Sequence, residues 1–397
     1  MRRYTEYFYP RLVSMLLSSD VLKDSFEILV SEVRLEVDGK EGSLRLRAFQ
    51  REIQERARKS RGILAVDAPT GSGKTLGFLL AAKQVIERGE NALLIYPTKM
   101  LIEDQTRSLS SLMEAVGLDA EIIPVDSERL EEVVKSSRDV KTHGEALIHL
   151  LSGEKGKIIL TNPDIVYVLL KQGFKRGSEL LQKLFTVGLV GIDEMHLYWG
   201  FSLHVIMLLL RMLRGRLRII STATHDEKVL AFLSDMLPED FESPIVAEEG
   251  EEGDIVRHPV RLEIGSIANK RVLTREEEAK ALRDIVLNIL EHTDASTSPR
   301  VVCIVNSLVF SRIVAGLLED EGLRITLINS LVPREYRVIG GNVDVLVGTS
   351  AVEVGVDFDT QALVFEANNS ASFIQRFGRV GRKRPGVAVA VVPYEDY

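Results

Sequence analysis

The sequence predicts an α/β protein in which two lobes, each built on a parallel β-sheet, are joined by a linker. Short apolar runs recur along the chain, and each is followed by a helical pattern. Runs of this kind, which do not alternate in polarity, are typical of parallel strands buried on both faces. The length of 397 residues favours two or three domains, since a domain typically holds about 150 residues.

The apolar runs fall into two sets, which places the first lobe at residues 44–245 and the second at 275–397. The expected strands are, in chain order, ILAVDA (63–68), ALLIYPT (92–98), EIIPV (121–125), KIILTN (157–162), LVGIDE (189–194), RIISTAT (218–224), VVCIVN (301–306), RITLIN (324–329), VDVLVGTS (343–350), ALVFEA (362–367) and VAVAVVP (387–393). Residues 246–274 are expected to link the lobes, because they are polar and carry an acidic run. They end in a capping-box pattern, Thr274 with Glu277, that opens a helix. Residues 1–43 are expected to form a separate, mainly helical lead-in.

Composition favours an ordinary soluble globular protein, with 45% hydrophobic and 27% charged residues. The single cysteine, Cys303, rules out a disulfide framework and fits a reducing, cytoplasmic setting. No apolar stretch near the start is long enough for a signal peptide or a membrane span, so no membrane partner is expected. The net charge of −8 does not by itself indicate nucleic-acid binding, although much of the acid is local to EEGEEGD, 248–254.

The strand ILAVDA runs directly into APTGSGKT, which indicates a nucleotide site. A glycine-rich turn between a strand and a helix lets backbone N–H groups converge on phosphate oxygens. Lys74 would add charge at the β- and γ-phosphates, and the Thr75 hydroxyl would be a ligand to Mg²⁺. The cofactors expected are therefore ATP and Mg²⁺. The binding segment comprises Pro69, Thr70, Gly71, Ser72, Gly73, Lys74 and Thr75.

Two adjacent carboxylates, Asp193 and Glu194, end the apolar strand LVGIDE. Acidic groups at the end of a buried strand are costly unless a cation or hydrogen bonds compensate them. Beside a P-loop, Asp193 can hold Mg²⁺ and Glu194 can orient and deprotonate the attacking water. His196 follows in the same loop, where it either couples hydrolysis to other elements or makes an ordinary polar contact.

The stretch FIQRFGRVGR spaces Arg376, Arg379 and Arg382 three apart, which would place them on one face of a helix. Gly378 and Gly381 lie between them, and a glycine inside a helix costs about 1 kcal/mol relative to alanine. We interpret the stripe as a source of arginine fingers for the γ-phosphate bound by the first lobe, with Arg379 and Arg382 catalytic. The alternative is a solvated basic helix.

The motif order APTGSGKT, PTKMLIEDQ, TNPD, DEMH, STAT, VGTSAVEVGVDF, QRFGRVGR resembles that of superfamily 2 helicases with a D-E-x-H box. The resemblance implies two tandem RecA-like lobes that hydrolyse ATP on nucleic acid. It implies that Phe49 and Gln50 contact adenine, that Gly355 and Asp357 lie near the ribose, and that Gln375 and Arg376 take part in coupling. It further implies strand contacts by Pro97, Thr98, Lys99, Thr161, Asn162, Thr349 and Ser350, and coupling by Ser221 and Thr222.

Within that superfamily, GVDFDTQALVFEANNSASFIQRFGRVGR and IDEMHLYWGFSLHVIMLLLRML resemble the helicase subunit of type I CRISPR nuclease-helicases. This resemblance implies a motor on single-stranded DNA that works with a guide-RNA surveillance complex. No HD-type nuclease cluster is expected in this chain, since His225-Asp226 lacks further spaced ligands, so an HD nuclease would be a separate subunit. Alternatives are a DNA-repair or RNA helicase, or an ATP-switched interaction module that does not translocate.

Overall fold

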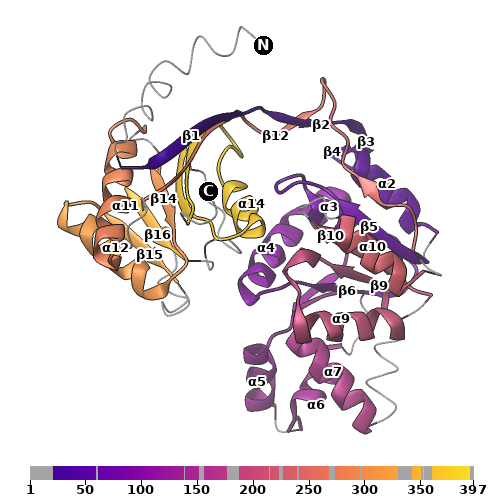
Figure 1. Ribbon diagram of the computed structural model, residues 1–397. Helices are drawn as coiled ribbons and strands as arrows, with labels where there is room; N and C mark the ends of the chain where they lie inside the picture. The colour runs from indigo at the N-terminus through magenta and orange to yellow at the C-terminus, as the bar shows by residue number, and fades with distance from the viewer. Residues whose placement is uncertain are drawn as a thin grey trace. The chain divides into compact units, whose positions relative to one another are not determined.

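The computed structural model describes residues 21–59, 61–137, 139–151, 156–176, 187–213, 215–222, 227–238, 241–267, 273–294, 297–329, 342–349, 352 and 360–393. The chain divides into two compact units (Figure 1). One unit, called here the first lobe, is Leu35–Asp254. The other, called the second lobe, combines Met1–Arg34 with Ile255–Tyr397.

The first lobe is built on a seven-stranded sheet of order β11-β5-β10-β9-β6-β8-β7, in which the neighbouring strands run parallel. Every described residue of β5, β8, β9 and β10 is buried, as expected for parallel strands covered on both faces. The strands are β5 (Gly62–Asp67), β6 (Asn91–Ile95), β7 (Glu121–Pro124), β8 (Lys157–Thr161), β9 (Val187–Ile192), β10 (Leu217–Thr222) and β11 (Ile245–Val246).

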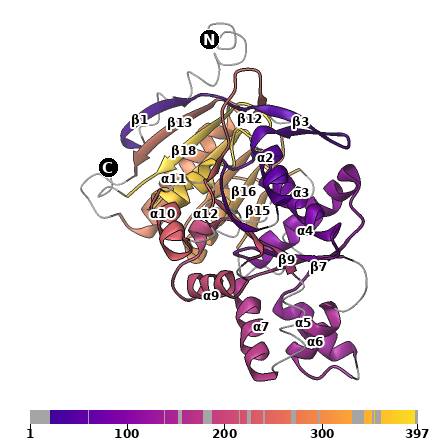
Figure 2. The ribbon, with the colours of Figure 1, turned by 90° about the vertical axis from the view of Figure 1, so that its right-hand side faces the viewer.

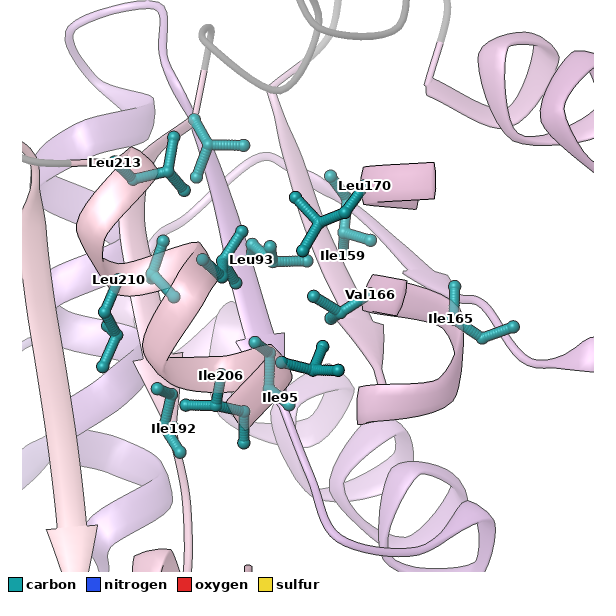
Figure 3. Close-up of a cluster of buried hydrophobic side chains, with 14 of the residues drawn as sticks. Leu93, Ile95, Ile159, Ile165, Val166, Leu170, Ile192, Ile206, Leu210 and Leu213 are labelled. Atoms are coloured by element: carbon teal, nitrogen blue, oxygen red, sulfur yellow. The ribbon is translucent and has the colours of Figure 1, made fainter. Parts of the chain in front are cut away.

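Helices follow most of these strands and cover the sheet. Figure 3 shows Val166 and Leu170 from one helix and Ile206 from another packed among Leu93 and Ile159 of the strands, all within one buried cluster. The helices are α2 (Ala48–Ala57), α3 (Lys74–Ile86), α4 (Lys99–Val116), α5 (Ser127–Ser136), α6 (His143–Leu151), α7 (Pro163–Arg176), η1 (Met195–Leu197), α9 (Gly200–Met212) and α10 (Glu227–Met236). In the described part of the chain, no helix is long and apolar enough to cross a membrane.

The second lobe is built on a seven-stranded sheet of order β1-β13-β18-β17-β14-β16-β15, parallel except for β1, which pairs antiparallel with β13 (Figure 2). The expected capping box is present, because the Thr274 hydroxyl accepts from Glu277 N and the Glu277 carboxylate accepts from Thr274 N. The elements are β1 (Lys23–Val30), β13 (Val260–Ser266), α11 (Arg275–Leu290), β14 (Val301–Ile304), α12 (Leu308–Asp320), β15 (Ile325–Ile328), β16 (Val345–Gly348), β17 (Ala362–Glu366), α14 (Ser370–Phe377) and β18 (Gly386–Val391).

The helical lead-in expected at residues 1–43 is corrected by the structure, whose described part of that segment forms strands. These are β1, β2 (Val33–Leu35) and β3 (Val37–Glu41), with β3 paired to β4 (Leu44–Arg47). The stretch EVRLEV, 32–37, alternates in polarity, which is the period of a half-buried strand rather than of a helix. On β1, Glu27 forms a salt bridge with buried Arg261 of β13. The residues expected as a linker also carry β12 (Asp254–Arg257), which pairs with β2, and β13.

Candidate nucleotide site and motor residues

The P-loop lies between β5 and α3, as the motif predicts. Gly71 and Gly73 have φ values of 80° and 84°, in the left-handed region that favours glycine. A Cβ on Gly73 would lie 2.6 Å from Gln50 Nε2. The backbone conformation therefore favours glycine at position 73, and a larger residue there would also displace the Gln50 side chain.

Two residues that enter from α2 and the strand before it hold the backbone of the P-loop. Gln50 donates to Gly73 O at 2.9 Å and accepts from Arg47 N at 2.9 Å. The Arg47 guanidinium donates to Ser72 O. Phe49, predicted to contact adenine, is only 2% exposed, so its ring lies in the interior of the lobe. Gln50 thus lies beside the P-loop, whereas Phe49 anchors α2 in the interior of the lobe.

The acidic pair faces the P-loop lysine. Lys74 Nζ lies 3.3 Å from Glu194 Oε1 and donates to Ala68 O at 3.2 Å. Glu194 has φ 53° and ψ 51°, and among the described residues it is the one non-glycine residue with positive φ. Such a backbone is retained only where surrounding contacts determine it, and it is common in active sites. In this conformation the Glu194 carboxylate lies beside Lys74.

Asp193 is buried under this pair. Its Oδ1 accepts from Glu194 N at 3.0 Å and from the Ser221 hydroxyl. Burial, with a smaller contribution from the charge of Glu194, raises the pKa of Asp193 from 3.8 to about 6. Two adjacent carboxylates, one of them buried, supply oxygen atoms of the kind that a hard divalent cation such as Mg²⁺ prefers.

His196 connects the acidic pair to the end of β10. Its Nδ1 lies 3.2 Å from Thr222 Oγ1 and 3.6 Å from Glu194 Oε2. The structure therefore brings together the predicted residues of three separate motifs: Lys74 after β5, Asp193, Glu194 and His196 after β9, and Ser221 and Thr222 at the end of β10.

The predicted strand-contacting residues of the first lobe lie at the carboxyl ends of β6 and β8. Thr98 is the exposed N-cap of α4, Pro97 precedes it, and Lys99 Nζ is 3.1 Å from Glu128 Oε1. The buried Thr161 hydroxyl donates to Val125 O, and Asn162 Oδ1 accepts from Ile165 N at 3.1 Å. Thr161 and Asn162 thus already make structural bonds within the lobe.

In the second lobe, Thr349 is buried and donates its backbone N–H to Ile328 O. Ser350, Gly355 and Asp357 lie outside the described residues, as do His225 and Asp226. Among the described residues there is no group of three or more His, Cys, Asp or Glu side chains able to hold a metal ion.

The expected stripe of three arginines on one helix is wrong. Helix α14 ends at Phe377, Gly378 caps it, and Gly381 has φ 75°. Gly378 is the C-cap of the helix and Gly381 lies beyond it, so neither glycine carries the cost of an interior helical position. Arg376 is 3% exposed and its guanidinium donates to Glu366 O, so it is a buried structural group.

Arg379 and Arg382 lie past the end of α14, in the segment that leads to β18, and both are half-buried. Arg382 Nε donates to Gly378 O at 2.9 Å. Gln375, in the last turn of α14, is also half-buried.

Sequence reasoning missed three residues of the site. Arg47 holds the P-loop backbone, the Thr75 hydroxyl donates to Gln105 Oε1 at 2.8 Å, and Tyr198 donates to Ile95 O at 3.3 Å beside the backbone of Asp193. Arg47 stands three residues before Gln50, on the same turn of chain, and that proximity was a usable signal. Gln105 reaches Thr75 only through the packing of α4 on α3, which no local pattern encodes.

Two largely parallel sheets, with a P-loop, an acidic pair and a hydroxyl pair gathered at the carboxyl edge of one of them, form a candidate nucleotide-binding core. Residues 47–232 match the DEAD/DEAH box helicase family, and residues 315–385 match the C-terminal part of the CRISPR-associated nuclease/helicase Cas3. Just under half of the chain thus resembles DEAD/DEAH box helicases of superfamily 2, and a shorter C-terminal segment resembles Cas3.

Individual relatives are distant. The chain is 29% identical to the uncharacterized ATP-dependent helicase YprA of Bacillus subtilis over 39% of its own length and 19% of the relative. It is 25% identical to the probable ATP-dependent RNA helicase DDX52 of Bos taurus over 84% of its own length and 53% of the relative. The chain thus spans between a fifth and about half of these curated relatives.

A solved structure shares the fold over nearly the whole chain. It is the DUF1998 helicase MrfA bound to DNA and AMPPNP, with a TM-score of 0.69 at 20% identity, covering 96% of this chain and 55% of that one. The likeness supports the two-lobe RecA-like fold.

Proposed function

We propose that this chain is an ATP-driven motor that translocates along single-stranded DNA. The observation that carries the proposal is the continuous set of contacts from Lys74 through Glu194 and His196 to Thr222. It joins the residues that would hold the phosphates to those that would report hydrolysis. A static nucleotide-binding module needs the first part of this network but not the second.

The roles follow from the positions of the side chains. Lys74 and the P-loop amides hold the β- and γ-phosphates, and Thr75 and Asp193 are the residues that would hold Mg²⁺, which would neutralise phosphate charge when bound. Glu194 is placed to orient and deprotonate the attacking water, since its carboxylate is the more exposed of the pair. Arg379 and Arg382 are proposed to stabilise the charge that develops on the γ-phosphate.

Coupling is proposed to run through His196. When Glu194 exchanges its contact with Lys74 for one with water and phosphate, its distance to His196 changes, and His196 is held by Thr222 at the end of β10. Strand contacts are proposed for the residues after β6 and β8, together with Thr349, Ser350 and the neighbouring second-lobe motif. Gly355 and Asp357 are proposed to lie near the ribose, and Gln50 near adenine.

DNA is the proposed track because the structure that resembles nearly the whole chain holds DNA. RNA is the competing track, because the DDX52 relatives are named RNA helicases. A second, narrower proposal is that the chain is the motor half of a type I CRISPR interference system, working with a separate HD nuclease and a guide-RNA complex. The match of residues 315–385 to Cas3 favours it.

The test is ATP turnover by the purified chain with single-stranded DNA, with single-stranded RNA and with neither. Stimulation by DNA above RNA, together with directional displacement of a paired strand, is the expected result. ATP turnover that neither nucleic acid stimulates would contradict the proposal of a translocating motor and would favour an ATP-switched interaction module. The CRISPR proposal is tested separately, by adding a guide-RNA complex and an HD nuclease and measuring DNA degradation that requires ATP.

A further inference from the structure

Three aromatic rings and a lysine gather on the surface of the first lobe at the start of α7 and α9. Trp199 is 80% exposed, Phe201 61% and Tyr167 40%. Tyr167 and Phe201 meet edge to face with ring centroids 5.0 Å apart, and Lys171 Nζ lies 5.8 Å from the Tyr167 centroid. We call these four residues the aromatic platform. Large rings are normally the residues a lobe buries, so their exposure together marks a binding surface.

The inward faces of both helices are already satisfied. Val166 and Leu170 of α7 and Ile206 and Leu210 of α9 lie in the core cluster shown in Figure 3. The platform residues are therefore not displaced core residues. Gly200, with φ 54° and open space around it, allows the sharp turn between extended Trp199 and the helix. The turn directs the chain so that Trp199 stays outside the lobe.

The position of the platform indicates its occupant. Helix α7 begins directly after Thr161 and Asn162 at the carboxyl end of β8, and α9 follows β9 through the short helix η1. Since β8, β6 and β9 are parallel, their carboxyl ends meet at one edge of the sheet. The platform thus lies at the edge that also carries Thr98, Lys99 and Asn162, where the nucleic-acid strand is expected.

Charge at the platform fits a phosphodiester backbone. Lys171 supplies a cation, and the first turn of α9 contains no acidic residue and has no side-chain cap on its N–H groups. Free N–H groups at a helix start attract anions. Asp164 opens α7, so phosphates are expected on the side of α9 rather than on that of α7.

We propose that the aromatic platform binds single-stranded nucleic acid by stacking bases on Trp199 and Phe201, as an extension of the strand track in the first lobe. The proposal rests on the proposed function and adds to it a contact set that the helicase motifs do not contain. Stacking tolerates any base, because every base presents a flat π-face, and this suits a motor that moves along arbitrary sequence. A partner protein is the competing occupant, for which exposed Leu208 on α9 would be an additional contact.

Trp199 is the only tryptophan of the chain, which makes the test direct. Oligothymidylate is titrated into the full chain while tryptophan fluorescence is recorded, and an abasic strand of equal length serves as the unstacked control. We expect quenching by oligothymidylate and much weaker quenching by the abasic strand. Binding is measured in parallel by the anisotropy of a labelled strand, so that variants without tryptophan can be compared.

Trp199→Ala is expected to weaken strand binding about tenfold, equivalent to ~1.4 kcal/mol. Trp199→Phe should keep most of the affinity, because it keeps a ring. Phe232→Ala, which removes a 38%-exposed ring on α10, is the matched control and should bind as the wild type does. Basal ATP turnover without nucleic acid should be unchanged in all three, which also verifies folding.

The outcomes separate the platform from the motor. If nucleic acid stimulates ATP turnover but neither quenches Trp199 nor binds more weakly to Trp199→Ala, the platform is wrong while the motor stands. If no strand binds or stimulates ATP turnover, the proposed motor function is wrong, and the proposed role of the aromatic platform is wrong with it. An equal loss of affinity in Trp199→Ala and Phe232→Ala would also overturn the platform, because the effect would not be specific to it.

Discussion

The hydroxyl of Thr75 donates to Gln105 Oε1 at 2.8 Å, and this bond joins the end of the P-loop to the second turn of α4. The hydroxyl has one proton, so giving it to Gln105 leaves the oxygen lone pairs facing away from α4. That orientation is the one a hydroxyl needs to be a ligand to Mg²⁺. The same helix begins at the exposed N-cap Thr98, which is predicted to contact the strand.

Replacing Gln105 should therefore weaken the metal-dependent part of nucleotide binding. In Gln105→Ala the hydroxyl rotor is free, and we expect ATP affinity in the presence of Mg²⁺ to fall several-fold while affinity in EDTA changes little. Gln105→Glu keeps an acceptor and should retain most of the affinity. Fluorescent-nucleotide titration with and without Mg²⁺ measures both. Equal losses under the two conditions would mean that Gln105 only packs α4.

The contact of Lys74 with Glu194 predicts opposite behaviour of two variants. Lys74→Ala removes the charge that would hold the β- and γ-phosphates, so both ATP binding and turnover should be lost. Glu194→Gln keeps the shape of the site but removes the base, so ATP should bind with near wild-type affinity and turnover should fall by roughly 10²–10⁴. Nucleotide titration and phosphate release are the measurements. Turnover near the wild-type rate in either variant contradicts the role of that residue.

Burial of Asp193 predicts a pH-dependent cost in stability. Its pKa rises from 3.8 to about 6 on folding, so the native protein binds more protons than the unfolded chain between these values. The contribution of Asp193 to the free energy of unfolding therefore falls as pH rises through this window and stays low above it. The full loss is at most about 3 kcal/mol.

Asp193→Asn tests this cost, because Asn Oδ1 can still accept from Ser221 and from Glu194 N. Without nucleotide or Mg²⁺, the free energy of unfolding at pH 8, measured by urea titration, should be roughly 1–3 kcal/mol higher for the variant than for the wild type. The difference should disappear near pH 4. A variant less stable than the wild type at pH 8 would show that the hydrogen bonds of the carboxylate outweigh its desolvation.

Sequence patterns predicted the elements that are determined by residues close together in the chain. Buried strands such as ILAVDA read directly as apolar runs, and the turn GSGK needs glycines for its backbone conformation. The alternation in EVRLEV, 32–37, was the local signal that the described part of the lead-in contains strands rather than helices. Pairing of β1 with β13 joins residues far apart in the chain, and no local signal reports such a pairing.

The site followed the same rule. Lys74 was predicted from the glycine-rich P-loop motif, and Asp193 and Glu194 from their place at the end of an apolar strand, whereas Gln105 reaches Thr75 only through the packing of α4 on α3. Spacing alone misled for FIQRFGRVGR, since residues three apart share a face only while the helix continues, and this helix ends at Phe377. The consequence is that the three arginines have different surroundings.

These surroundings predict that substitutions of the arginines separate into two classes. Arg376 is buried, and its guanidinium donates to Glu366 O, so Arg376→Ala leaves a buried acceptor unsatisfied and should destabilise the second lobe by about 1–3 kcal/mol and lower the yield of folded protein. Arg379 and Arg382 are half-buried beyond the helix. If they stabilise the γ-phosphate in the transition state, alanine at position 379 or 382 should keep the unfolding temperature within a few degrees of the wild-type value, while kcat falls by about 10³ or more.

Thermal unfolding and ATP turnover, measured on the same preparations, distinguish these classes. Lys383→Ala is the matched control, because it removes a neighbouring cation of the same segment and should alter neither quantity. ATP affinity should also stay close to that of the wild type in Arg379→Ala and Arg382→Ala, since an arginine that acts on the transition state adds little to ground-state binding. If kcat is unchanged in both, the interpretation as arginine fingers is wrong, and the basic segment is then a solvated or strand-contacting one.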